Sequence, residues 1–89
     1  MRMHLWIKGR VQGVGYRYFV DDTARRHRLT GWVRNLPDGS VEAEAQGEEL
    51  ELRRFVAHLK SGHPWARVDA LREEKIPDDS GEKSFEIRI

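Results

Sequence analysis

The sequence predicts an α+β fold in which two helices cover one face of an antiparallel sheet. Short runs with apolar residues at every second position alternate with two longer stretches whose apolar residues recur every three or four positions. These patterns follow one another in the order βαββαβ. A chain of 89 residues has material for one hydrophobic core. We therefore expect a ferredoxin-like, split βαβ sandwich that forms a single domain over residues 1–89.

The first half of the chain contains three of the expected strands and one helix. Alternation from Met3 to Ile7 predicts the first strand, and apolar residues at helical spacing predict an amphipathic helix over about 16–28. Residues 30–35 are typical of a second strand, and the turn formers in 36–39 lead into a third strand over 41–46. The glutamates of this third strand predict one polar, solvated face.

The second half predicts a helix and two strands. Apolar spacing from Leu52 to Leu59 indicates a helix over about 48–61, which glycine and proline at 62 and 64 would end. A weaker strand pattern covers Val68 to Glu74, and alternation from Phe85 to Ile89 predicts a final strand. We expect that last strand to add a short hairpin partner near the C-terminus.

The composition excludes several classes of function. Sixteen basic and 15 acidic residues are interspersed, so the net charge of +1 provides no field that would attract nucleic acid. Without cysteine there is no disulfide, thiolate catalysis or zinc–sulfur site. No apolar run approaches a membrane span, and the N-terminus lacks the layout of a signal peptide. We expect a cytoplasmic monomer without membrane contacts.

Residues 9–17 are the most informative stretch and read GRVQGVGYR. A strand stops there, and glycines lead into a helix, so several backbone N–H groups are left unpaired and aimed at one point. Arg17 adds a forked cation that suits phosphate or carboxylate oxygens. The stretch therefore predicts an anion site.

Topology predicts a neighbour for this loop. Right-handed crossovers make the first two strands parallel, with the third strand between them. Asn35, at the end of the second strand, then lies at the same edge of the sheet as the glycine loop and Arg17. Sites in α/β sheets tend to lie at the carboxyl ends of parallel strands.

Several alternative phosphate or nucleotide sites do not fit. A Walker loop needs lysine and then serine or threonine after its last glycine, but Tyr16 and Arg17 follow Gly15. A dinucleotide fingerprint needs glycine where Tyr18 stands. RNA-recognition domains share the βαββαβ order, yet they stack bases on aromatic residues of the third strand, which here reads VEAEA.

Two segments resemble the signatures of the acylphosphatase family. Gly9 to Arg17 fits the pattern Gly-x-Val-Gln-Gly-Val-x-Phe/Tyr-Arg throughout. Gly31 to Asn35 fits Gly-Trp-Val-x-Asn, and a glycine-containing turn follows it. The resemblance covers nearly the whole chain, because its length, element order and final strand also fit.

The resemblance implies an enzyme that hydrolyses acyl phosphates to a carboxylate and inorganic phosphate, without cofactor, metal ion or covalent intermediate. Arg17 would hold the phosphate, and Asn35 would orient the attacking water. Backbone N–H groups of the phosphate-binding loop would assist Arg17, and they come from Gln12, Gly13, Val14, Gly15 and Tyr16.

Some alternatives stay open at this point. The same fold would serve as a non-catalytic module that binds a phosphate or carboxylate metabolite, or as a domain of a larger carbamoyl-phosphate-processing protein. If the carboxylate of Ile89 lies at the active edge, it would pair with Arg17. The four histidines show no metal-binding spacing, and Tyr16 is expected in the core.

Overall fold

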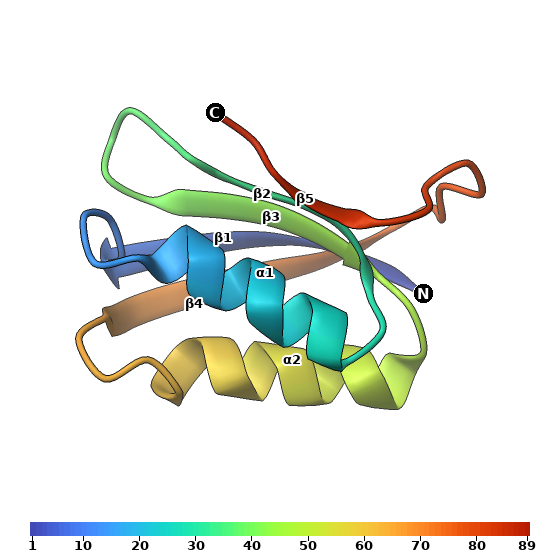
Figure 1. Cartoon of the computed structure of the whole chain (residues 1–89), viewed down its shortest axis with the longest axis horizontal. Helices are drawn as coiled ribbons and strands as arrows, with labels where there is room; N and C mark the ends of the chain where they lie inside the picture. Colours follow the sequence, from blue (N-terminus) through green and yellow to red (C-terminus); the bar gives the residue numbers. More distant parts are fainter.

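A computed structural model describes all 89 residues, and its elements follow the predicted order. The strands and helices are β1 (Arg2–Arg10), α1 (Tyr16–Arg26), β2 (Thr30–Asn35), β3 (Val41–Gln46), α2 (Glu49–Ser61), β4 (Arg67–Ile76) and β5 (Phe85–Ile87). Both helices lie on one face of a single sheet, as predicted (Figure 1). None of the helices is long and apolar enough to cross a membrane.

The strand order in the sheet is β4-β1-β3-β2-β5. Strand β3 pairs antiparallel with both β1 and β2, so β1 and β2 are parallel with β3 between them, which confirms the predicted topology. The expected antiparallel hairpin at the C-terminus is wrong, because β4 pairs with β1 whereas β5 pairs in parallel with β2 at the opposite edge. The sheet is therefore mixed.

The segment between β4 and β5 crosses the end of the sheet and is held there by polar contacts. Arg2, which is only 4% exposed, donates from Nη1 to Glu82 at 2.7 Å and from Nε to Glu44 at 2.9 Å. Gln46 and Asp79 exchange two hydrogen bonds of 2.7 and 3.1 Å. These contacts hold the segment across the end of the sheet. Strand β5 therefore pairs with β2 at the far edge and does not form a hairpin with β4.

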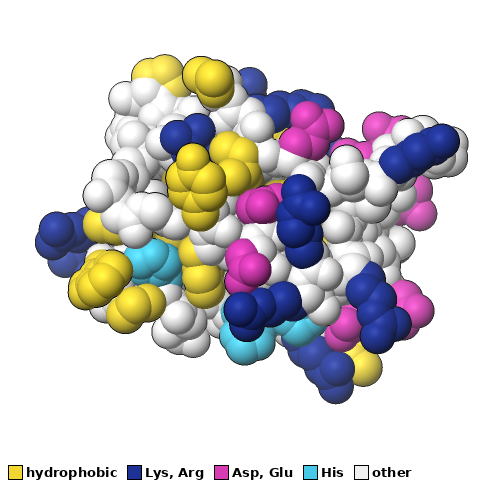
Figure 2. All heavy atoms as spheres, in the orientation of Figure 1, with side chains coloured by type: hydrophobic (Ala, Val, Ile, Leu, Met, Phe, Trp, Pro, Cys, Tyr) yellow, Lys and Arg dark blue, Asp and Glu magenta, His cyan; other side chains and the backbone are white.

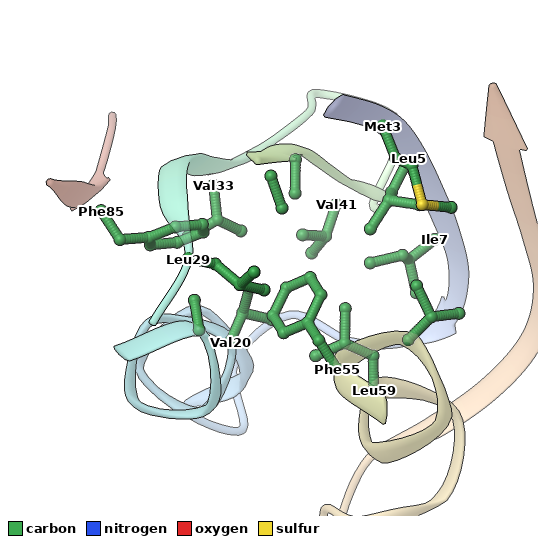
Figure 3. Packing of buried hydrophobic residues seen from close by; sticks show 14 of the residues in the cluster. Met3, Leu5, Ile7, Val20, Leu29, Val33, Val41, Phe55, Leu59 and Phe85 are labelled. Atoms are coloured by element: carbon green, nitrogen blue, oxygen red, sulfur yellow. The ribbon is translucent and has the colours of Figure 1, made fainter. Parts of the chain in front are cut away.

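The hydrophobic core lies between the sheet and the two helices (Figure 3). Alternate residues of β1 and β3 meet the apolar stripes of both helices, and Phe55 and Val20 are fully buried among them. Tyr16 is also in the core, as predicted, and its hydroxyl donates to the Leu59 carbonyl at 2.7 Å. Burial raises the pKa of the Tyr16 phenol, so this side chain stays neutral.

The open face of the sheet carries aromatic rings and ion pairs, and here one expectation is wrong. Glu42 is 8% exposed rather than solvated. It accepts a hydrogen bond from Arg34 Nε at 2.6 Å, and His4 Nε2 lies 2.7 Å from its other oxygen. His4 stacks on Trp6, with ring centroids 3.9 Å apart. These long neighbouring side chains shield a carboxylate that strand alternation alone assigns to solvent.

Glu42 is expected to give a stability that depends on pH. Burial works to raise the pKa of Glu42, but hydrogen bonds from Arg34 and His4 outweigh it and lower that pKa. The stabilisation is then complete above the unfolded-state pKa of about 4.3 and is lost as pH falls through the folded-state pKa. Glu42→Gln should lower the free energy of unfolding by about 1.5–3 kcal/mol at pH 7 and by less at pH 3, measured by denaturant titration. A loss that is equal at both pH values would contradict this.

Candidate active site

The connection between β1 and α1 turns at two glycines. Gly13 has φ 73° and Gly15 has φ 75°, in the left-handed region that side chains rarely adopt. No atom lies within 4 Å of where a Cβ would stand at either position, so both glycines are required by the backbone conformation and not by crowding. No backbone N–H of residues 12–15 donates to a backbone carbonyl. The loop therefore presents a set of free donors to open space.

Helix α1 begins without a side-chain cap. Gly15 is the N-cap residue, and no side chain accepts a hydrogen bond there. The backbone bond nearest this end runs from the Phe19 N–H to the Gly15 carbonyl at 3.1 Å, so the N–H groups of residues 16–18 precede it. These donors and the positive end of the helix dipole point to an external anion.

Gln12 joins the glycine loop to the turn between β2 and β3. Its side-chain Nε2 donates to the carbonyls of Leu36 and Ser40, at 2.8 Å each. The turn is itself locked, because the Asp38 carboxylate accepts hydrogen bonds from the hydroxyl and the N–H of Ser40, which lower the pKa of Asp38. Sequence reasoning missed this role of Gln12, because its partners are backbone carbonyls of a distant turn.

Asn35 is the last residue of β2, and the environment of its side-chain oxygen Oδ1 is unusual. Its position matches that of Val33, two residues earlier, so its side chain lies on the helix side of the sheet, opposite Trp32. Asn35 Oδ1 is buried without any hydrogen-bond partner, and no other side-chain atom in the chain shares that condition. A buried acceptor left unpaired costs about 1–3 kcal/mol, so such an atom calls for a functional explanation.

Arg17 lies in the first turn of α1 and is partly buried. Its Nη1 donates to the backbone carbonyl of Arg88 at 3.0 Å, and no carboxylate lies within ion-pair distance. The Arg88 N–H in turn donates to the Val33 carbonyl at 2.8 Å. The C-terminal segment thus holds Arg17 through a neutral carbonyl and not through the carboxylate of Ile89, the pairing that the sequence left open.

These parts surround one small cavity of about 140 Å³. Arg17 is its only cationic side chain, and it shares the cavity with Asn35 and the glycine loop. Pockets for drug-sized ligands occupy about 300–1,000 Å³, so this cavity suits a compact anion. The residues that line it are Val11, Gln12, Gly13, Gly15, Tyr16, Arg17, Tyr18 and Asn35. The structure therefore brings Arg17, Asn35 and most of the predicted loop together; Val14 faces a neighbouring groove.

The histidines lie in separate places. His4 is on the open face of the sheet, and the rings of His27 and His58 approach to 5.4 Å between the helices. His63 packs edge-on against Phe19, with ring centroids 5.2 Å apart. None of them lines the cavity that contains Arg17 and Asn35.

The architecture has a close counterpart among solved structures. The crystal structure of acylphosphatase from Bacillus subtilis superposes with a TM-score of 0.94 and 39% identity, over 99% of this chain and 98% of that one. The class of protein is therefore that of the small ferredoxin-like phosphatases.

The sequence comparisons make the assignment specific. The family model for acylphosphatase matches residues 3–87. An acylphosphatase of Bacillus licheniformis is 41% identical over 98% of this chain and 97% of its own length. One of Geobacillus kaustophilus is 45% identical over 97% of this chain and 92% of its own length. The chain belongs to the acylphosphatase family, and it is an enzyme.

Proposed function

We propose that this protein hydrolyses acyl phosphates to a carboxylate and inorganic phosphate without a metal ion. In this proposal Arg17 and the backbone N–H groups of Gln12 to Tyr16 bind the phosphate, and Asn35 orients the attacking water. The observation that carries it is the buried, unpartnered Oδ1 of Asn35, which shares a cavity with Arg17 and the free donors of the loop.

The phosphate end of the substrate fits the charge of the cavity. Backbone N–H groups at two left-handed glycines and at a helix N-terminus form an anion-binding concavity. Arg17 adds a planar cation whose fork matches phosphate oxygens. Its tie to the Arg88 carbonyl fixes the side chain while leaving its other N–H donors for the ligand. The preorganised donors supply the charge stabilisation that phosphoryl transfer needs.

Asn35 supports the attacking water. Its amide has no basic nitrogen, but Oδ1 accepts a hydrogen bond from water and thereby aims an oxygen lone pair at phosphorus. The water oxygen bonds to phosphorus as the bond to the acyl oxygen breaks, and the electron pair leaves on the carboxylate. The water proton passes to a phosphate oxygen. A carboxylate with a conjugate-acid pKa of about 4.3 leaves without acid assistance.

The proposal predicts metal-independent turnover. Purified protein should hydrolyse a simple aryl acyl phosphate at the same rate with and without excess EDTA, because Arg17 and the loop already stabilise the charge on phosphorus. The measurement is the loss of the acyl phosphate absorbance over the spontaneous background. Turnover that disappears with EDTA and returns with Mg²⁺ would contradict metal independence. Rates no higher than spontaneous hydrolysis would contradict the proposed activity and favour the alternative, a non-catalytic module that binds a phosphate or carboxylate metabolite.

We infer further that the protein acts as a monomer in the cytoplasm. A chain without cysteine suits a reducing compartment. The hydrophobic core is buried within the single chain, so no second copy is needed to cover it. Sedimentation equilibrium should give the mass of one chain across a wide range of protein concentration, whereas a mass that rises toward two chains would refute the monomer.

A further inference from the structure

We propose that the acyl group of the substrate lies in a groove between Trp65 and Arg10, and that this groove favours aromatic acyl groups. The inference rests on the proposed function, since it concerns the part of the same substrate that extends beyond the phosphate. It assigns a specificity role to two residues outside the phosphate cavity.

The groove adjoins the phosphate cavity. It has a volume of about 440 Å³ and is lined by Arg10, Gly13, Val14 and Trp65. Gly13 also lines the phosphate cavity, so the two spaces meet at a residue without a side chain. No atom lies within 4 Å of where a Cβ of Gly13 would stand. An acyl group attached to a bound phosphate therefore has an open path across Gly13.

The strand order places this groove on the side that the reaction requires. Strand β1, which leads into the glycine loop, has β3 and then β2 on one side and β4 on the other. Asn35 ends β2, and Trp65 comes just before β4, so they flank the loop from opposite sides (Figure 1). Phosphoryl transfer places the attacking and leaving oxygens roughly in line. Water held by Asn35 thus directs the leaving acyl group toward Trp65.

Trp65 is held in place although it is exposed. Its side chain is 74% exposed, which is unusual for a large apolar residue of this chain. The Nδ1 atom of His63 accepts hydrogen bonds from the backbone N–H groups of Trp65 and Ala66, at 3.1 Å each, and the His63 ring lies edge-on to the indole with centroids 6.2 Å apart. His63 itself packs against Phe19 of α1. In Figure 2, hydrophobic side chains gather beside a histidine at the left end, where Figure 1 shows the connection from α2 to β4. The backbone of Trp65 is therefore fixed, and its exposed indole forms an apolar wall of the groove.

Arg10 is the second wall. Its side chain is exposed and takes part in no ion pair or hydrogen bond within the chain, so its guanidinium is available to a ligand. A free guanidinium stacks well on an aromatic face, and an indole contributes offset or edge-to-face contacts. Both walls therefore recognise a planar ring, whereas a small aliphatic acyl group would leave the groove unfilled.

The test compares benzoyl phosphate with acetyl phosphate. Trp65→Ala should lower kcat/KM for benzoyl phosphate roughly two- to tenfold, mainly through KM, and leave acetyl phosphate unchanged. Trp65→Phe should restore most of the benzoyl preference. Leu50→Ala is the matched control, because Leu50 is also a large exposed residue, 59% exposed, and lies outside the groove. That control should change neither substrate.

The outcomes separate this inference from the proposed function. If wild type hydrolyses neither substrate, the proposed function fails. If it hydrolyses both and Trp65→Ala lowers both equally or neither, the function stands and the groove is refuted. Arg10→Gln should also weaken benzoyl phosphate selectively. If it instead weakens only succinyl phosphate, which bears a second carboxylate, the groove recognises charge and the aromatic preference is overturned.

Discussion

Replacing Arg17 by alanine is expected to lower kcat/KM for an aryl acyl phosphate by about 10³–10⁵-fold, the range for an arginine that stabilises charge in phosphoryl transfer. Arg17 is the only cationic side chain in the cavity, so the variant would leave the phosphate with backbone dipoles alone. Arg17→Lys should recover only part of the loss, because an ammonium keeps the charge but not the planar fork. Steady-state kinetics and inhibition by inorganic phosphate measure both effects.

Thermal unfolding shows whether Arg17→Ala is still folded. The arginine makes one hydrogen bond within the chain, to the Arg88 carbonyl, so its loss should barely change the midpoint of thermal unfolding. Arg26→Ala is a matched control on the same helix, since Arg26 is exposed and pairs only with Asp22. Inhibition by inorganic phosphate that survives unchanged in Arg17→Ala would overturn the phosphate-binding role.

Asn35→Ala should separate turnover from binding. Without Oδ1 the attacking water is no longer held, and removing one such positioned polar group costs about 10²–10³-fold in kcat in other hydrolases. Inhibition by inorganic phosphate should stay unchanged, because Arg17 and the loop remain. Stability should stay level or rise, because the substitution removes a buried acceptor that has no partner.

This combination of lower turnover and undiminished stability excludes simple structural damage. Gln46→Ala offers the opposite control, because its amide lies at the other end of the sheet and bonds with Asp79. That variant should lose stability and keep its turnover. If Asn35→Ala retains wild-type turnover, the water-orienting role is refuted.

The anion site was predictable from sequence because its elements are local. Glycines that must adopt positive φ and a helix start without a capping side chain are set by a few adjacent residues. The position of Asn35 beside this loop was also predictable, because the handedness of crossovers places the ends of β1 and β2 at one edge of the sheet. The structure brings Asn35 and Arg17 to one cavity. Their catalytic roles stay predictions.

Long-range contacts could not be predicted. Gln12 spans to the β2–β3 turn, and the Arg88 carbonyl holds Arg17 from 71 residues away in sequence. Each of these bonds joins a side chain to a backbone carbonyl. Because every residue has such a carbonyl, the sequence does not indicate which one is the partner. The burial of Glu42 escaped prediction for a related reason, because its shielding comes from His4 and Arg34 on neighbouring strands.

The sequence by itself determined the order of elements, the parallel relation of the first two strands and the anion-binding character of the loop after β1. These follow from periodicity, glycine conformation and the handedness of crossovers, which act within one element or one connection. Only the tertiary structure decided that β5 joins β2, that Arg17 rests on a carbonyl and that Trp65 borders the loop. Those outcomes depend on which distant segments pack together, and packing depends on shape and unpaired polar groups that no local pattern records.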